Sequence, residues 1–412
     1  MTKILRFGRR GSFWSAAAVL ALCLWASGAP SVLYPVYAAE WKLSSVVTTS
    51  VFGAYPLALL VVLLVFGGLS DAIGRRRAML LGVALITLSA AVFAVAPNVG
   101  FLFAGRVLQG VGTGFAIGAA SASLVENNTS RNPRFASSMA TVSTSLGLTL
   151  ALFASGLLVQ LAPLPLVLSF AVLLVLGLLV LGLVWRTPGD APATRVRVRP
   201  QAPRFPRGMM RVFILSTVSV AVAYSIGAMF LSLGAQMARD LTGTTNLMVV
   251  GGLLAVSSLT IGLTALFLSR VHAHVSIMIG TVVSLAGLGL MAATTASGSV
   301  VLFLVWCVVG GVGYSFAFTG GLTLLNRTAP ERHRGGTLSL MYLFSYLMQA
   351  VTAVGAGALV TSLGLGAALG IAVPVLGVLC VLGFILAVVD LVARRRIRLA
   401  EVLRAPALDP TD

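Results

Sequence analysis

Residues 67–77 read GGLSDAIGRRR and lie between two long apolar runs. Asp71 and the three arginines at 75–77 cannot lie in hydrocarbon without a large cost, so the chain must leave an apolar environment here. Gly74 has no side chain and permits a tight reversal of the backbone. This stretch therefore predicts a short polar turn that joins two membrane-spanning helices.

The composition is that of a membrane protein. Of the 412 residues, 58% are hydrophobic and 9% are charged, with a mean hydropathy of +1.03; a soluble domain carries about 25% charged residues. The net charge of +18 would also suit nucleic-acid binding. However, only Lys3 and Lys42 are lysines, and the arginines are scattered over the ends of apolar segments. The expected partner is therefore the lipid bilayer, and no nucleic acid.

The chain contains twelve apolar segments, most of which reach the roughly 20 residues that a spanning helix needs. Helices are required, because lipid offers no hydrogen-bond partner to free backbone groups. The first segment mimics a signal peptide but is too long for one, so we expect it to remain as the first helix. The sequence therefore predicts an all-α membrane protein with transmembrane helices over residues 13–38, 45–69, 78–96, 100–125, 136–161, 164–185, 211–236, 246–269, 275–295, 299–325, 337–362 and 366–392.

The basic residues predict the orientation of these helices. If both termini lie inside, 25 of the 28 lysines and arginines fall at the inner side, and only Lys42 and Arg239 fall outside. Positive charge collects on the cytoplasmic side of membrane proteins. We therefore expect a multi-pass protein of the bacterial cytoplasmic membrane with both termini in the cytoplasm.

The chain also divides into two similar halves. Residues 108–116 (LQGVGTGFA) align with residues 309–317 (VGGVGYSFA), each in the fourth span of its half. Weak internal similarity of this kind is typical of duplicated transporter folds. The predicted parts are two six-helix bundles with a Pro- and Arg-rich linker and polar ends, over residues 1–12, 13–185, 186–210, 211–392 and 393–412.

The stretch at 67–77 resembles the loop between helices 2 and 3 of the major facilitator superfamily, G-x-L-[SA]-D-[RK]-x-G-R-[RK]. Ala72 departs from this pattern, and Arg106, Gln109 and Gly110 resemble the R-x-x-Q-G motif of the family's helix 4. The resemblance covers about residues 13–392 and implies two six-helix bundles that alternate access to a central site. It is closest to bacterial drug-efflux members, through residues 31–41 (SVLYPVYAAEW) ahead of the loop. The residues that match the loop pattern are Gly67, Leu69, Ser70, Asp71, Gly74, Arg75 and Arg76.

Arg106 is the one charged residue deep inside a predicted span, where it costs about 2.5–3.5 kcal/mol on insertion scales. Its spacing puts it on one helix face with Gln109 and Thr113. The resemblance implies that this arginine faces the cavity and takes part in proton coupling or substrate binding. The alternative is an arginine that reaches outward to the membrane surface. Glu40 is the nearest candidate for an acidic partner, and the alternative for Glu40 is an exposed loop carboxylate.

The loop motif also suggests a gate at the cytoplasmic side. The resemblance implies that Asp71 caps the start of helix 11 near Thr337, where free N–H groups favour a carboxylate. Arg75 would pair with Glu126 at the end of helix 4. The alternative is a set of solvated loop charges that contribute little. The expected gate residues are Gly67, Asp71, Gly74, Arg75, Arg76, Glu126 and Thr337.

Polar and aromatic residues recur on helices 1, 4, 7, 10 and 11, which the resemblance places around the cavity. They predict an aromatic pocket with few charges for an amphipathic solute, although interhelical packing would explain them too. These candidates for substrate contact are Tyr34, Tyr224, Tyr314, Thr319, Tyr342, Tyr346 and Gln349.

The sequence thus favours a secondary transporter that exports an amphipathic compound as protons enter. Helix 5 has Ala151 and Leu152 where drug antiporters of the family carry Gly-Pro, which leaves uptake of a nutrient such as a sugar or organic acid open. A non-transporting membrane receptor or scaffold is the third alternative. We expect no enzyme activity, cofactor or metal, since His272 and His274 lack further ligands and there is no P-loop. The expected working form is a monomer driven by a proton gradient.

Overall fold

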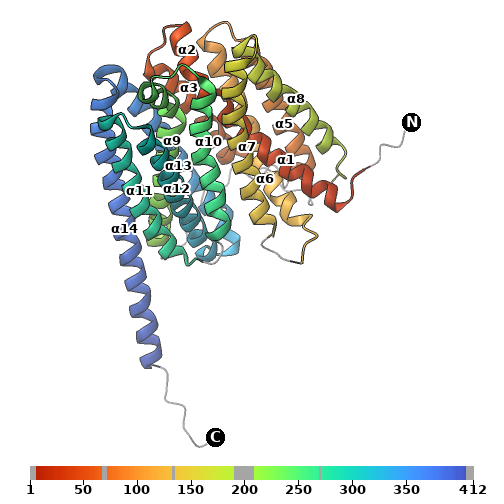
Figure 1. Ribbon diagram of the computed structural model, residues 1–412. Helices are drawn as coiled ribbons and strands as arrows, with labels where there is room; N and C mark the ends of the chain where they lie inside the picture. Colours follow the sequence, from red (N-terminus) through yellow and green to blue (C-terminus); the bar gives the residue numbers. More distant parts are fainter. Residues whose placement is uncertain (1–5, 67–71, 132–134, 190–207, 269–270, 405–412) are drawn as a thin grey trace, which may run out of the picture.

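The computed structural model describes residues 6–66, 72–131, 135–189, 208–268 and 271–404 (Figure 1). Within these ranges the regular structure is helical, without strands, and twelve helices are long and apolar enough to cross a membrane. The all-α, twelve-helix prediction is confirmed. The helices are α1 (Arg9–Gly28), η1 (Ala29–Val32), α2 (Tyr34–Glu40), α3 (Ser45–Phe66), α5 (Arg75–Ala94), α6 (Val99–Glu126), α7 (Phe135–Leu161), α8 (Pro165–Trp185), α9 (Met210–Thr242), α10 (Leu247–Phe267), α11 (Ala273–Ser297), α12 (Val300–Thr328), α13 (Glu331–Leu363) and α14 (Leu365–Arg404).

The first predicted span is not one continuous α-helix. It consists of α1, the short 3-10 helix η1 and α2. Pro30 and Pro35 lie at this break, and a proline removes a backbone N–H and crowds the carbonyl four residues earlier. The chain still crosses as one unit of 32 residues. This break, which lies in the second half of the span, is called below the bend of the first span.

Three helix ends differ from the sequence prediction by six residues or more, and one of them is the end of α9, at Thr242 rather than at 236. Helix α14 continues to Arg404 rather than ending at 392, and Figure 1 shows it running past the ends of its neighbours. The apolar signal stops at the membrane surface, whereas the residues that follow (RRRIRLAEVLR, 394–404) are good helix formers. Helix α13 begins at Glu331, six residues before the predicted start. Hydropathy therefore located the spans but not these polar helix ends.

We call the end of the bundle that holds the loops at 41–44, 95–98 and 243–246 the predicted outer end, and the opposite end the predicted inner end. The orientation in the membrane remains a prediction. Large apolar side chains are exposed on the flanks of the molecule, for example Val175 and Leu179 on α8 and Val378 on α14. Exposed apolar surface of this extent suits contact with lipid.

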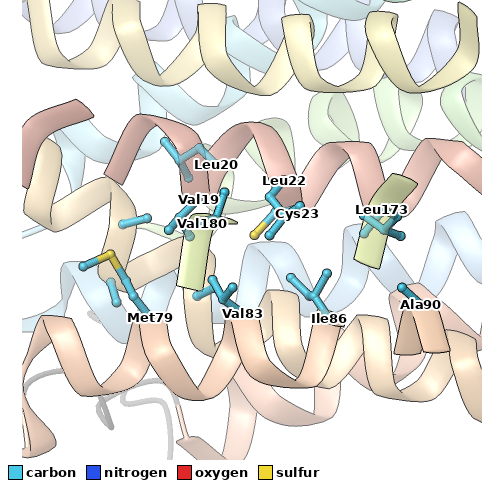
Figure 2. Close-up of a cluster of buried hydrophobic side chains, with 14 of the residues drawn as sticks. Val19, Leu20, Leu22, Cys23, Met79, Val83, Ile86, Ala90, Leu173 and Val180 are labelled. Atoms are coloured by element: carbon cyan, nitrogen blue, oxygen red, sulfur yellow. The ribbon is translucent and has the colours of Figure 1, made fainter. Parts of the chain in front are cut away.

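The first six spans form an N-terminal bundle with a dense core of its own. Figure 2 shows Val19 and Leu22 of α1 beside Val83 and Ile86 of α5, with Leu173 of α8 in the same cluster. The rings of Phe93 and Phe170 stack with centroids 4.6 Å apart. A core of side chains that interlock in this way resists deformation.

The two bundles meet mainly through two helix pairs, α3 with α13 and α7 with α10, and more lightly where α2, η1 and α3 touch α9. The second pair packs closely because Gly156 and Gly251 face each other, and a Cβ on Gly251 would lie 2.5 Å from the carbonyl oxygen of Leu152. In the first pair, Gly357 lies against Thr49. Small residues let helix backbones approach in a membrane, where no hydrophobic force drives them together.

Candidate functional site

A central cavity of about 270 Å³ lies between the two bundles. Both bundles supply its wall: α1, α3, α6 and α7 from the N-terminal bundle, and α9, α10, α12 and α13 from the C-terminal one. Its lining residues are Leu24, Ser27, Tyr55, Ile117, Thr141, Thr144, Ser145, Leu148, Tyr224, Ile226, Gly227, Phe230, Leu231, Ser257, Ser258, Ile261, Ala265, Trp306, Gly310, Tyr314, Ser315, Phe318, Thr319, Tyr346 and Gln349.

One side of this cavity is aromatic. Tyr224 of α9 is the centre of the group, with its ring centroid 4.8 Å from that of Tyr346 and 5.8 Å from that of Phe318. Tyr314 stacks on Tyr224 at 6.4 Å. Ring pairs at these separations stabilise one another by about 0.5–1.5 kcal/mol beyond their buried area. The group therefore forms a firm wall against which a flat apolar molecule can pack.

Another side of the cavity carries hydroxyl groups from α7 and α10. Thr144 donates to the carbonyl oxygen of Ala140 on its own helix at 3.0 Å, and Ser258 donates to that of Ala255 at 3.2 Å. A hydroxyl that donates to its own helix still offers a lone pair to another donor. These groups are therefore satisfied in an apolar setting, yet can accept a hydrogen bond from a solute.

Within the described residues, no Asp, Glu, Lys, Arg or His side chain lines the cavity. The polar side-chain groups of the lining residues are hydroxyls, the indole N–H of Trp306 and the amide of Gln349, whose buried Oε1 has no partner in the described part of the chain. An ion without a counter-charge is costly to hold in a dry site, whereas a neutral polar group needs only a hydrogen bond. The lining thus suits a solute that is partly apolar and partly hydrogen-bonding.

Arg106 lies behind the cavity wall, in the interior of the N-terminal bundle, and is fully buried. Its Nε donates to the Tyr34 hydroxyl at 2.8 Å, and its Nη2 donates to the same hydroxyl. Its Nη1 donates to the carbonyl oxygen of Ser27 and to Oε1 of Gln109, each at 3.1 Å. The Cζ atom lies 5.7 Å from the ring centroid of Tyr55. Neutral acceptors and aromatic rings therefore hold this charge in the structure.

The predicted site residues divide into two groups. Five of them line the cavity: Tyr224, Tyr314, Thr319, Tyr346 and Gln349. Six of them do not, namely Arg106, Gln109, Thr113, Tyr34, Tyr342 and Glu40. Among these six, Arg106, Gln109 and Thr113 are buried inside the N-terminal bundle, and the Tyr342 ring packs 6.1 Å from that of Tyr346.

The expected pair of Glu40 with Arg106 is absent. Glu40 is the last residue of α2 and is exposed, whereas Arg106 is fully buried and uses the acceptors on Tyr34, Ser27 and Gln109. The carboxylate keeps its hydration at the surface, which is the less costly arrangement. The guanidinium does not reach the surface of the bundle either, so it is not an outward-reaching arginine.

The sequence prediction missed the contributions of α3, α7 and α10. Tyr55 was the signal on α3, because a tyrosine in the middle of an apolar span needs a polar partner. On α7, Thr141, Thr144 and Ser145 follow helical spacing and lie on one face. The adjacent Ser257 and Ser258 give α10 its polar stripe.

At the predicted inner end, Arg75 and Glu126 form the expected pair, with Nε and Oε1 3.3 Å apart. Gly74 precedes α5 with a φ of 92°, a left-handed conformation that favours glycine. Arg76 donates to the carbonyl oxygen of Trp185 at 2.6 Å, at the end of α8. These contacts tie α5 to α6 and α8 within one bundle.

The structure describes only one of the other three predicted gate residues. Gly67 and Asp71 lie outside the described residues. Thr337 is buried and lies within α13, which begins at Glu331, so the expected helix start near Thr337 is wrong. The backbone N–H of a residue this far inside a helix is bonded within the helix, whereas the contact of Asp71 with the start of this helix stays a prediction.

A polar cluster that the sequence did not predict lies between α11 and α14. Asp390 is 7% exposed, and its Oδ2 lies 2.7 Å from Nε2 of His274 and 2.7 Å from Nε of Arg394. His274 was expected in a loop, but it is the second residue of α11. The cluster joins two helices of the C-terminal bundle away from the central cavity.

Comparison with known proteins agrees with this architecture. A family model described as Major Facilitator Superfamily matches residues 13–276 and 253–409. No curated protein sequence matches the chain. Its fold is similar to solved structures of the POT family transporter PepTSo (TM-score 0.74, 13% identity, 95% of this chain and 99% of that one) and of a mutant of the nucleoside transporter NupG (0.73, 12%, 92% and 100%). It is also similar to a bacterial homolog of the human lysosomal transporter Spinster in an inward-facing, occupied conformation (0.71, 15%, 94% and 97%).

Proposed function

Because this chain belongs to the Major Facilitator Superfamily and is a membrane transporter of that type, we propose that it exports a small amphipathic organic solute and that inward proton movement drives the export. The central cavity is the proposed binding site. Two bundles that rock about it would expose the site to each side of the membrane in turn.

The observation that carries the choice of solute is the lining of the cavity. An aromatic wall built on Tyr224 faces a site with hydroxyls on α7 and α10 and no charged side chain among the described residues. Apolar surface supplies most of the affinity in such pockets, and a few polar groups fix the orientation. A molecule with a ring on one side and hydrogen-bonding groups on the other fits this lining.

Efflux and proton coupling are supported by the resemblance of residues 31–41 and 67–77 to drug-efflux members. The proposed driving force is the proton gradient, and the proposed location is the bacterial cytoplasmic membrane, with a monomer as the working form and both termini inside. We expect Arg106 to take part in the coupling of proton movement to solute movement, because it contacts Ser27 and Tyr55 of the cavity wall.

A second candidate function is the uptake of a hydroxylated nutrient. The hydroxyl groups of Thr144, Ser145 and Ser258 at the cavity favour it, since they would exchange hydrogen bonds with a sugar-like solute. The absence of Gly-Pro at 151–152 in α7 is consistent with this direction too. Under this alternative the fold and the site are unchanged, and only the solute and the direction differ.

The test is solute flux in proteoliposomes with and without an imposed pH gradient. Export predicts that an acidic outer side accelerates outward movement of a neutral aromatic compound, whereas uptake predicts inward movement of a hydroxylated one. Tyr346→Ala should reduce flux at least tenfold, because it removes part of the aromatic wall. Leu347→Ala is the matched control, since Leu347 is the next residue on α13 and is 44% exposed. Equal flux in both variants would contradict the proposed binding site. No flux with any solute would contradict the transport proposal and favour a receptor or scaffold.

A further inference from the structure

The bend of the first span is held by a residue from another helix. The break lies between Ser27, in the last turn of α1, and Tyr34, at the start of α2. Pro30 and Pro35 carry no backbone N–H, so the hydrogen-bond ladder of the span is interrupted at these two positions, although Ala29 and Leu33 still donate to the carbonyl oxygens of Trp25 and Pro30. A partner that bonds to both sides of such an interruption restricts the geometry of the chain there.

Arg106 supplies that partner on both sides of the break. Its Nη1 donates to the Ser27 carbonyl oxygen before the break at 3.1 Å, and its Nε donates to the Tyr34 hydroxyl after it at 2.8 Å. The guanidinium is planar and carries its donors in a fixed arrangement, so bonds to both sides define the angle between them. Gln109, one turn further along α6, accepts a third bond and fixes the arginine itself.

The two bonded residues belong to different cavities. Ser27 lines the central cavity. Tyr34 lines a second cavity of about 510 Å³ near the predicted outer end, together with Pro35, Ser45 and Gln236. One buried side chain thus connects the wall of the central site with the wall of an outer vestibule.

The outer vestibule is also a place where the two bundles are joined. Ser45 donates from its hydroxyl to Oε1 of Gln236 at 3.4 Å, between α3 and α9. The N–H of Val46 donates to Oγ1 of Thr361 on α13 at 2.9 Å. Helix α2 packs against both α3 and α9, so a change in its angle would reach these contacts through its two neighbours.

From this arrangement we infer that Arg106 is a positioning residue that holds the bend of the first span and thereby keeps the predicted outer end closed. The inference rests on the proposed function, because it assumes that the bundles alternate between a state with the outer end open and a state with the outer end closed. A solute that displaces Ser27 in the cavity wall would weaken the bond from its carbonyl oxygen to the guanidinium and so loosen the hold of Arg106 on Tyr34. Occupancy of the central site would then be transmitted to the outer contact through one side chain.

The test measures closure of the outer end by cross-linking. Val46→Cys and Thr361→Cys are introduced together after Cys23, Cys307 and Cys380 are replaced by alanine, and a short thiol-reactive cross-linker is applied in membranes. Tyr34→Phe in this background should lower the cross-linking rate about tenfold, within the usual range of coupling between sites. Arg106→Lys should act in the same direction, because an ammonium lacks the fixed fork that reaches both acceptors.

Tyr37→Phe is the matched control. Tyr37 lies one turn further along α2, is also buried, and has a hydroxyl without a hydrogen-bond partner in the described part of the chain. Its cross-linking rate should equal that of the parent. Equal rates in Tyr34→Phe and Tyr37→Phe, with both proteins monodisperse, would overturn the inference. A tenfold difference between them in a protein that moves no solute would support the positioning role and count against the proposed function.

Discussion

Removal of the Tyr34 hydroxyl should destabilise the protein, because this hydroxyl accepts hydrogen bonds from the buried Arg106. In Tyr34→Phe the ring remains, but two guanidinium N–H groups of Arg106 lose their acceptor in a fully buried site. A hydrogen bond to a charged group contributes about 1.5–3 kcal/mol, and the buried donors cannot turn to water instead. Since both donors share one acceptor, we expect a loss of about 3 kcal/mol in the free energy of unfolding.

A double-mutant cycle separates this interaction from general damage to the first span. Arg106→Met keeps the length of the apolar part of the side chain and removes the charge. In that background Tyr34→Phe should cost less than about 1 kcal/mol, which leaves a coupling energy of about 2 kcal/mol between the two residues. Tyr37→Phe should be neutral or slightly stabilising in either background, because its hydroxyl is buried without a partner in the described part of the chain.

The assay is thermal unfolding of the four proteins in one detergent, with unfolding rates compared at a fixed temperature where unfolding is irreversible. A coupling energy below about 0.5 kcal/mol would refute the reasoning, since independent sites add within that margin. The reasoning would also be refuted if Tyr37→Phe were as destabilising as Tyr34→Phe, because loss of any hydroxyl of α2 would then have the same effect.

Further substitutions address the interface between the bundles and the polar clusters outside the cavity. Gly251→Val should lower stability by about 1–3 kcal/mol, the usual cost of overpacking, because its Cβ would lie 2.5 Å from the carbonyl oxygen of Leu152; an unchanged melting temperature would contradict the close approach of α7 and α10. Asp390→Asn should lower stability by about 2 kcal/mol, since it removes the carboxylate charge that pairs with Arg394 and contacts the His274 ring, while Glu126→Gln should cost less than about 1 kcal/mol because its pair with Arg75 is solvated. Equal losses in these two variants, measured by thermal unfolding, would show that burial does not decide the strength of these pairs.

The sequence predicted the spans well because hydrocarbon imposes a simple rule on length and polarity. A helix must contain about 20 apolar residues to cross, and each interruption has to be polar. The rule says nothing about the polar helix ends at Glu331 and Arg404, because these residues need not be apolar to remain helical. It also cannot find the break at Ala29–Val32, since a 3-10 turn is as apolar as the helix around it.

The site was predicted only in part, because its decisive contacts join distant segments. Arg106 was recognisable as a buried charge, but its main partner, Tyr34, lies 72 residues earlier in the chain. On α13, Tyr342 and Tyr346 share a helix face, yet only Tyr346 lines the cavity. Spacing identifies a face, whereas the depth of the cavity along that face depends on the partner bundle.

The contacts that join the two bundles differ from those that hold each bundle together. Within the N-terminal bundle, large apolar side chains interlock, as in the stacked rings of Phe93 and Phe170. Between the bundles, apolar packing such as that of Leu152 is accompanied by glycine approaches and by hydrogen bonds between neutral groups. Two such bonds join Thr149 with Ser258 at 2.9 Å and the N–H of Leu247 with Oε1 of Gln160 at 3.0 Å. Interhelical hydrogen bonds in membranes contribute about 0.6 kcal/mol each on average.

This difference in strength fits a cycle in which rigid bodies separate and rejoin. A solute can shift a conformational equilibrium only by its difference in affinity for the two states, and such coupling energies are typically about 1–3 kcal/mol. A few neutral hydrogen bonds of about 0.6 kcal/mol each lie within that range, whereas a buried ion pair that costs about 3–5 kcal/mol to break does not. The strong polar cluster at Asp390 accordingly lies inside one bundle, between α11 and α14, where no movement has to break it.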